Sequence, residues 1–189
     1  MSLMPEVAEV SEVAVLPEVA AGPEAARGAV LRPATRAELP AVLALLADEE
    51  RVVDPASVVV GEAYERAFAA IEADPRNELL VLVAAESGEA DRAGGADRRA
   101  VVLGCLQATY IPGLGKGGAE RVLIEAVRIR ADRRGTGLGR VLMEGAVARA
   151  RERGCALVQL TSNKERAAAH RFYEGLGFTA SHDGFKRML

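Results

Sequence analysis

The sequence has few of the residues that mark secreted, metal-binding or membrane proteins. Its 189 residues include two cysteines and two histidines. Two cysteines are too few for a disulfide framework, and the cysteines and histidines lack the spacing of a metal site. No apolar run reaches the roughly 18 residues that cross a bilayer. The N-terminus also lacks a basic segment followed by an apolar one. We therefore expect a cytoplasmic protein without a metal and without a membrane partner.

The sequence also lacks an excess of positive charge, since its 24 lysines and arginines are outnumbered by 27 acidic residues and no basic stripe is visible. Nucleic acid is therefore not an expected partner. Residues 1–28 carry five glutamates against one arginine, and the other 161 residues come to about +1. Those first 28 residues repeat Glu-Val units among Ala, Pro and Gly. This composition predicts a disordered or loosely docked acidic tail, with a partner-binding segment as the alternative.

The remaining chain, residues 29–189, is long enough and hydrophobic enough for one domain. The hydrophobic pattern predicts strands at 30–33, 78–86, 100–110, 119–130 and 155–161, a strand pair at 178–189, and helices at 35–47, 62–73, 138–153 and 162–176. Two loops, at 87–99 and 111–118, separate the middle strands. Three successive strands followed by a strand–helix–strand unit predict an α/β fold, with a mixed sheet and helices on both faces.

The most informative stretch is a glycine turn between the predicted strand at 119–130 and the helix that follows it. Residues 133–139 read Arg-Arg-Gly-Thr-Gly-Leu-Gly. Arg140 occupies the place of the third glycine in a dinucleotide-binding fingerprint, so that motif is excluded. Bare backbone N–H groups at the start of a helix favour an anion. The turn therefore predicts a site for a phosphorylated cofactor, and a merely flexible connection is the alternative.

Two motifs together carry a resemblance to a known family. Residues 134–139 fit the Arg/Gln-x-x-Gly-x-Gly/Ala signature of the GNAT superfamily of N-acetyltransferases. Residues 163–178 resemble its second motif, an asparagine followed by a helix that ends Phe-Tyr-x-x-x-Gly-Phe. The order of elements from residue 30 to the end is also similar to that of the family. The resemblance implies a GNAT-like acyl-CoA N-acyltransferase fold, whose central mixed, mostly antiparallel sheet is flanked by helices.

The same resemblance implies acetyl-CoA as the cofactor. It places part of the central strand along the pantetheine arm, at Ala126, Val127, Arg128 and Ile129. It assigns the pyrophosphate to the backbone of the turn, at Arg134, Gly135, Thr136, Gly137, Leu138 and Gly139. Asn163 would lie near the pantetheine arm, although it could serve only as a helix cap. The oxyanion of the tetrahedral intermediate would be held by the backbone N–H of Val127.

Tyr173 and Glu125 are the candidate catalytic residues. By the family motif, Tyr173 would protonate the departing thiolate; a phenol with a pKa of about 10 is protonated at neutral pH. Its alternative is an aromatic residue packed at the edge of the sheet. Glu125 lies in an otherwise apolar strand, where an unpaired buried carboxylate is costly. It would be the base, directly or through water, unless it faces a solvated groove or pairs with Arg128 or Arg130.

These features predict an enzyme that moves the acetyl group of acetyl-CoA to an amine by direct attack in a ternary complex. A small-molecule amine is the preferred acceptor, with a site near residues 110–116 and the first two helices. Acetylation of protein N-termini or lysines is one alternative, and a catalytically silent acyl-CoA sensor is another. Dimers are frequent in the family, so a homodimer is also open.

Overall fold

The computed structural model describes residues 28–47, 53–84 and 101–189. The predicted acidic tail at 1–28, apart from its last residue, and the predicted loop at 87–99 lie outside these residues. The helices and strands follow in the order β1 (Ala29–Pro33), α1 (Leu39–Ala47), α2 (Glu62–Ala73), β2 (Asn77–Ala84), β3 (Val102–Ile111), β4 (Arg121–Ile129), α3 (Leu138–Glu152), β5 (Leu157–Leu160) and α4 (Ala167–Glu174). Most predicted bounds agree with these within two residues.

The strands form one five-stranded sheet whose spatial order is the order of the chain, β1-β2-β3-β4-β5. The first three pairs are antiparallel, and only β4 and β5 run parallel. The crossover from β4 to β5 contains α3, as a parallel connection requires. The predicted mixed, mostly antiparallel sheet is confirmed.

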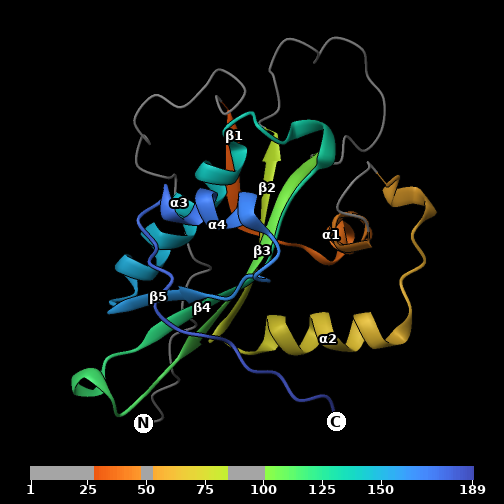
Figure 1. The fold of residues 1–189 in the computed structure, drawn as a ribbon. Helices are drawn as coiled ribbons and strands as arrows, with labels where there is room; N and C mark the ends of the chain where they lie inside the picture. The colour runs from red at the N-terminus through yellow and green to blue at the C-terminus, as the bar shows by residue number, and fades with distance from the viewer. Residues whose placement is uncertain (1–27, 48–52, 85–100) are drawn as a thin grey trace, which may run out of the picture.

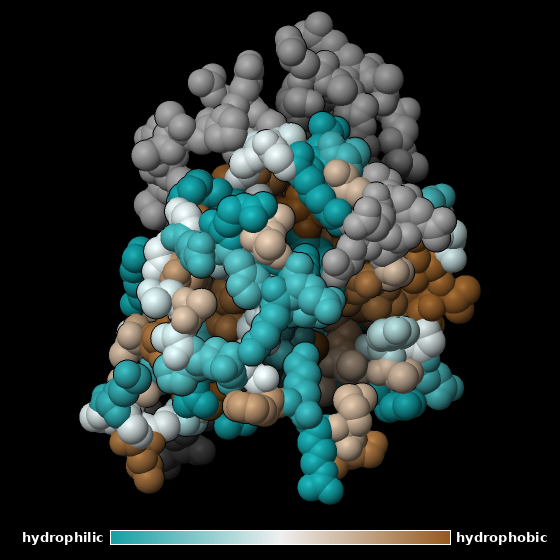
Figure 2. Space-filling view, in the orientation of Figure 1, coloured by the Kyte–Doolittle hydropathy of each residue, from teal (hydrophilic) through white to brown (hydrophobic). Residues whose placement is uncertain are grey.

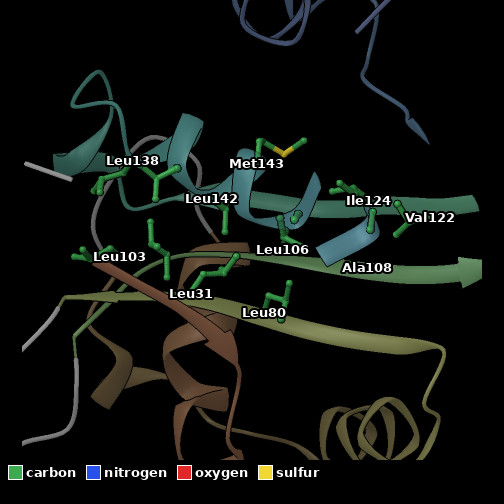
Figure 3. Close-up of a cluster of buried hydrophobic side chains, with 14 of the residues drawn as sticks. Leu31, Leu80, Leu103, Leu106, Ala108, Val122, Ile124, Leu138, Leu142 and Met143 are labelled. Carbon is green, nitrogen blue, oxygen red and sulfur yellow. The ribbon is translucent and has the colours of Figure 1, made fainter. Parts of the chain in front are cut away.

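Helices cover both faces of this sheet, as predicted (Figure 1). On one face, α3 inserts a row of large apolar side chains that includes Leu138, Leu142 and Met143. Figure 3 shows this row meeting the sheet at residues such as Leu106 and Ile124. Full burial of such a side chain is worth about 2–3 kcal/mol. These contacts therefore fix the position of α3, and with it the turn that precedes α3.

The opposite face of the sheet is covered by α1 and α2. Val42 and Leu45 of α1 pack on Val81 and Cys105, and Phe68 of α2 packs with Leu39 and Leu43 of α1. The predicted cap at the entrance to α1 is confirmed, because the backbone N–H of Thr35 donates to Glu38 Oε2 at 2.8 Å. Both described helices on this face thus lie close to where the sequence predicts them.

A cluster of charged and aromatic side chains ties the end of α3 to the lower end of the sheet. We call it the foot cluster; it consists of Glu78, Tyr110, Glu120, Arg149 and Arg153. Arg149 Nη2 donates to Glu78 Oε1 at 2.6 Å, and the Tyr110 hydroxyl donates to Glu78 Oε2 at 2.8 Å. Arg153 pairs with Glu120 at 2.8 Å and lies 4.1 Å from the centre of the Tyr110 ring. Tyr110 is thus buried, and an acceptor site near residues 110–116 stays a prediction.

The helix predicted from residue 162 begins five residues later. Asn163 Oδ1 accepts a hydrogen bond from the Glu165 backbone N–H at 3.1 Å, and the Asn163 carbonyl accepts one from Arg166 N at 3.0 Å. This side chain therefore stabilises a turn that competes with the helix. Ser162, the predicted cap, has a buried hydroxyl without a hydrogen-bond partner among the described residues. The predicted capping box is wrong, and α4 begins at Ala167.

The predicted strand pair at 178–189 is also wrong, because these residues have no regular secondary structure. Phe178 packs edge-on against Tyr173, with 6.0 Å between ring centres. Beyond it, Phe185, Met188 and Leu189 are more than 90% exposed. An apolar pattern forms a strand only where one face of it is buried, and here nothing in the described chain buries it. Among the described residues, no helix is long and apolar enough to cross a membrane.

Candidate active site

The centre of the site is a bulge in β4. Glu125 lies opposite Gln107, and Arg128 lies opposite Cys105. Two β4 residues, Ala126 and Val127, therefore face one β3 residue, which is the arrangement of a β-bulge. Ala126 has a φ of 54°, a left-handed conformation that costs a non-glycine residue about 1 kcal/mol or more. The β4 residues themselves do not reveal this bulge, since a run of β-branched and apolar residues predicts a regular strand.

Gly104 of β3 makes room for the segment beyond the bulge. A Cβ at this position would lie 2.7 Å from the Arg128 carbonyl oxygen and 2.6 Å from Ile129 Cδ1. No side chain fits there without moving the β4 backbone. A glycine inside a buried strand is a signal of a bulge or a close approach, so the sequence did carry a trace of this feature.

Beyond the bulge, β4 is paired on one side only. On its other side, the parallel pairing with β5 runs from Arg121 to Ile124 and stops there. Residues 125–129 therefore have no strand next to them on that side within the described chain, although β3 still pairs with them. An extended molecule can bind such an edge through backbone hydrogen bonds. Ala126, Val127, Arg128 and Ile129, the predicted pantetheine segment, are half-buried along this edge.

The glycine turn follows directly and leads into α3. Gly135 and Gly137 have φ values of 74° and 87°, which a side chain disfavours. Thr136 Oγ1 donates to the Arg133 carbonyl at 2.6 Å and holds the turn closed. Among the described residues, the backbone N–H groups of residues 135–139 donate to no acceptor. The turn thus presents a row of free donors at the positive end of the helix dipole.

The other residues of the turn differ in what their side chains do. Leu138 is buried in the core, so only its backbone can serve a ligand. A Cβ on Gly139 would lie 3.3 Å from Phe172 Cζ, so this glycine allows α4 to approach α3. Gly139 thus has a packing role in the structure, and the role of its backbone toward a pyrophosphate stays a prediction. Arg134 is exposed, and its Nε donates to the Ile129 carbonyl at 3.3 Å.

Tyr173 comes from α4 and lies partly buried beside the upper part of β4. Its ring contacts Phe172 at 5.2 Å and Phe178 at 6.0 Å between ring centres, and it packs on the same core as Val127. Burial raises the pKa of the phenol, while the charges of Arg166 and Arg128 act in the opposite direction. The phenol is therefore protonated at neutral pH, as its predicted role requires.

Glu125 lies immediately before the bulge, and it is exposed. This exposure fits the alternative in which Glu125 faces a solvated groove, and its role as the base stays a prediction. Within the described chain its side chain makes no hydrogen bond or ion pair, so the alternative pairing with Arg128 or Arg130 is absent there. A carboxylate at this position remains accessible to an acceptor from solvent.

Asn163 lies in the turn between β5 and α4. Its side-chain oxygen is engaged by the backbone of Glu165, and its carbonyl also bonds His170 Nε2 at 2.9 Å. This favours a role in shaping the loop. The described residues contain no group of three or more histidine, cysteine or acidic side chains that could hold a metal.

A separate cavity of about 930 Å³ lies between α1, the connection after it and the end of β4. Its lining includes Glu38, Ala44, Ile129 and Arg130, but neither Glu125 nor Tyr173. It therefore adjoins the predicted pantetheine segment at Ile129, and it does not contain the two predicted catalytic side chains. Figure 2 shows that hydrophilic residues dominate the face over α4, on the side of the predicted catalytic tyrosine.

Comparison with known proteins places this geometry in a family. Residues 41–178 match the model of the Acetyltransferase (GNAT) family. None of the curated protein sequences is a match for this chain. Among solved structures, a transcriptional regulator from Bacillus halodurans C-125 is 38% identical, with 85% of this chain and 99% of that chain covered and a TM-score of 0.67.

Two more distant structures share the fold. Glucosamine-6-phosphate N-acetyltransferase from Arabidopsis thaliana is 18% identical, covers 85% of this chain and 97% of its own, and has a TM-score of 0.61. AAC(6')-Iy, in complex with the bisubstrate analogue CoA-S-monomethyl-acetylneamine, is 15% identical, covers 85% and 98%, and has a TM-score of 0.62. The family match spans the bulge, the glycine turn and Tyr173, and the chain therefore belongs to the GNAT family of acetyltransferases.

Proposed function

We propose that this protein transfers the acetyl group of acetyl-CoA to the amine of a small molecule, by direct attack in a ternary complex. Acetyl transfer is the chemistry of the family to which the chain belongs. The observation that carries the proposal is the one-sided pairing of β4 at residues 125–129, which leads into the free N–H groups of the glycine turn. An extended thioester with a pyrophosphate needs these two features in this order.

The residues present fit this cofactor. The N–H groups of residues 135–139 would hold its pyrophosphate, and Arg134 adds positive charge beside them. The free edge of Val127 and its neighbours would bind the pantetheine arm through the backbone. When bound, acetyl-CoA supplies an activated acetyl group as a thioester. The Val127 N–H is the proposed donor to the oxyanion.

Glu125 and Tyr173 have opposite tasks in the proposed mechanism. Glu125, exposed before the bulge, takes a proton from the acceptor amine, directly or through a water molecule. Tyr173, partly buried on α4, gives its phenolic proton to the leaving sulfur. An accessible base and a partly buried acid suit these tasks, because the acceptor enters from solvent while the thiolate forms inside the protein.

A small acceptor is favoured over a protein by one fold neighbour. AAC(6')-Iy was solved with a compound that joins CoA to an acetylneamine. This supports a fold that can hold both substrates at once. A protein N-terminus or lysine is the other acceptor class.

A second candidate function is a silent acyl-CoA sensor. It is favoured by the 38% identical structure, which is described as a transcriptional regulator. Both Glu125 and Tyr173 are present in this chain, which favours the enzyme.

The test combines calorimetry with CoA and thiol release from acetyl-CoA over a panel of aminosugars, polyamines, free amino acids and peptides. Binding of CoA together with thiol release that depends on a small amine would support the proposal. Binding without release across the panel would favour the sensor. Faster release with peptides than with free amines would favour protein acetylation, and no CoA binding would reject both proposals.

A further inference from the structure

Ser162 has a buried hydroxyl group that the fold does not use. Its Oγ has almost no exposed surface and no hydrogen-bond partner among the described residues. The predicted use, as the cap of the last helix, is wrong because α4 begins at Ala167. A buried polar group without a partner lowers stability, so its presence in a folded protein needs a physical reason.

The chain that follows Ser162 is held by contacts with two other segments. The Asn163 carbonyl bonds His170 Nε2 of α4 at 2.9 Å. Lys164 Nζ pairs with Asp183 Oδ1, near the end of the chain, at 2.7 Å. The hydroxyl therefore belongs to a turn with defined contacts, and its missing partner is not the result of a loose chain end.

Ser162 lies just beyond the point where β5 separates from β4. The parallel pairing of the two strands ends at Ile124 and Leu160, and Ser162 is two residues further along the chain. The same register, if continued, would bring Ser162 opposite Ala126, the left-handed residue of the bulge. Ser162 therefore borders the open edge of β4 at the end that is farther from the glycine turn.

Polar groups that lack a strand partner thus border this gap from two sides. On one side is the backbone of β4 at residues 125–129, and on the other is the hydroxyl of Ser162. An extended ligand that carries amide groups suits both sides, because each amide has a donor and an acceptor. The pantetheine arm of CoA is a ligand of this class.

We propose that Ser162 is a cofactor-binding residue whose hydroxyl hydrogen-bonds the amide of the pantetheine arm that is nearest the thioester. The inference rests on the proposed function. In the free protein the hydroxyl has no partner and lowers stability; in the complex the amide is its partner and the hydroxyl strengthens binding. Ser162 thus helps to orient the thioester beside the bulge, and it takes no part in making or breaking bonds.

The first test compares stability with cofactor affinity in Ser162→Ala. Removal of an unpaired buried hydroxyl should leave the urea midpoint of the free protein unchanged or raise it. The dissociation constant for acetyl-CoA, measured by calorimetry, should rise about 10-fold, because the amide of the arm loses its partner. A serine that only stabilises the fold would instead give a lower urea midpoint when its hydroxyl is removed.

Ser57→Ala is the matched control, because the hydroxyl of Ser57 has a partner. Its Oγ donates to the Asp54 carbonyl at 2.7 Å, in the 3₁₀ turn Pro55–Ser57. This substitution should lower the urea midpoint slightly and leave the dissociation constant for acetyl-CoA unchanged. Ser162→Cys is a second variant of the proposed residue; a thiol is a weak donor, so this variant should also bind acetyl-CoA less tightly. Circular dichroism checks the folding of each variant.

The second test asks which part of the cofactor Ser162 contacts. ADP has a pyrophosphate but no pantetheine arm, so an NMR titration should give the same dissociation constant for wild type and Ser162→Ala. Gly137→Val changes the turn that is proposed to hold the pyrophosphate, and it should weaken the binding of both ADP and acetyl-CoA. The two variants should therefore separate the arm from the pyrophosphate.

The outcomes distinguish the inference from the proposed function. If Ser162→Ala and Ser162→Cys bind acetyl-CoA as tightly as wild type does, the inference fails and the proposed function stands. If Ser162→Ala has a lower urea midpoint and binds both ADP and acetyl-CoA less tightly, the hydroxyl has a structural role and the inference also fails. If the wild-type protein binds neither ligand, the proposed function fails, and the inference fails with it.

Discussion

The lower and upper halves of β4, residues 121–124 and 125–129, have the same kind of sequence and opposite environments. The lower half has a strand on each side, β3 and β5, and ends at the foot cluster. The upper half has a strand on one side, a bulge with a left-handed alanine, and a turn of free N–H groups after it. In the lower half the polar groups are satisfied; in the upper half the backbone is left open.

The difference indicates that the lower half of β4 stabilises the fold and that the upper half is available for function. Satisfied, half-buried ion pairs and apolar packing at the lower end hold α3 against the sheet. The upper end can then keep unpaired donors and a strained residue, which would destabilise a strand that had no such support. We therefore expect substitutions in the lower half to change stability and those in the upper half to change ligand binding or turnover.

The largest effect is expected from Gly137→Val in the glycine turn. Valine disfavours the φ of 87° at this position and would place a side chain among the N–H groups that hold the pyrophosphate. The dissociation constant for CoA, measured by calorimetry, should rise about 100-fold or more, the equivalent of about 2.7 kcal/mol.

Gly154→Val is the matched control for this substitution, because it places the same strain at the other end of α3. Gly154 has a φ of 82°, and no atom lies within 4 Å of an added Cβ. Both variants should lose about 1–2 kcal/mol of unfolding free energy. Only Gly137→Val should lose affinity for CoA. If Gly137→Val and Gly154→Val bind CoA equally well, the glycine turn is not part of the cofactor site.

The next largest effect is expected at Tyr173, and Tyr110 is the tyrosine with which it is compared. Tyr173→Phe should lower kcat about 100-fold with little change in CoA affinity, because it removes the acid and keeps the ring contacts with Phe172 and Phe178. Tyr110→Phe in the foot cluster removes a hydrogen bond to Glu78 and should cost about 1 kcal/mol of stability with kcat unchanged. Steady-state rates and urea unfolding separate the two. Full activity in Tyr173→Phe would return this residue to a packing role.

A third comparison concerns arginines of α3. Arg149→Met breaks a half-buried pair and leaves Glu78 with its tyrosine partner alone, so we expect a loss of about 2 kcal/mol of unfolding free energy. Arg140→Met removes a surface pair with Glu144 at 3.1 Å and an exposed hydrogen bond to the Gly175 carbonyl at 3.3 Å, and it should cost less than about 1 kcal/mol. Urea unfolding at pH 7 measures both. Equal losses would show that the foot cluster contributes no more than a surface pair.

The loss of unfolding free energy in Arg149→Met should depend on pH in a direction that the pKa of Glu78 determines. Burial would raise the pKa of Glu78, but the hydrogen bonds from Arg149 and Tyr110 outweigh it, and the pKa lies below its usual value of 4.5. A carboxyl with a lowered pKa in the folded state stabilises the protein above that usual value and loses the contribution as the pH falls through the folded pKa. The difference between wild type and Arg149→Met should therefore shrink below about pH 4.5.

The sequence predicted the lower half and the glycine turn better than the upper half. Apolar periodicity located the strands and α3, because burial on one face determines them. The turn was found because glycine spacing at a helix start has a direct physical meaning. The bulge at Ala126 was missed, because the extra residue in β4 is an ordinary strand residue and does not interrupt the apolar pattern. The sequence also left the exposure of Glu125 open, because an apolar strand can be left uncovered on one face.

The last helix and the chain end show a second limit. Ser162 and Glu165 have the spacing of a capping box, yet Asn163 competes locally and delays the helix to Ala167. The strand pair at 178–189 was predicted from apolar residues alone, but strands also need a surface to pack on. Whether a segment forms a helix or a strand at such places depends on its neighbours in space, and the spacing of residues in the sequence does not identify these neighbours.

The smallest effect is expected from Glu125→Gln, which tests whether the upper half of β4 supplies a base. Glutamine keeps the shape of the side chain but cannot accept the amine proton. At low pH, fewer amine molecules are neutral and base assistance matters most, so kcat/KM should fall about 10-fold near pH 6 and less above pH 8. Glu120→Gln, at the start of the same strand but paired with Arg153, should leave the pH profile unchanged. Because Glu125 is exposed and makes no ion pair with any of the described residues, its loss should not alter stability, so any change in the profile reports on chemistry. If Glu125→Gln and wild type have the same pH dependence of kcat/KM, water and not Glu125 removes the amine proton. The two halves of β4 would then differ in function only through the open edge at residues 125–129, which is proposed to bind the cofactor.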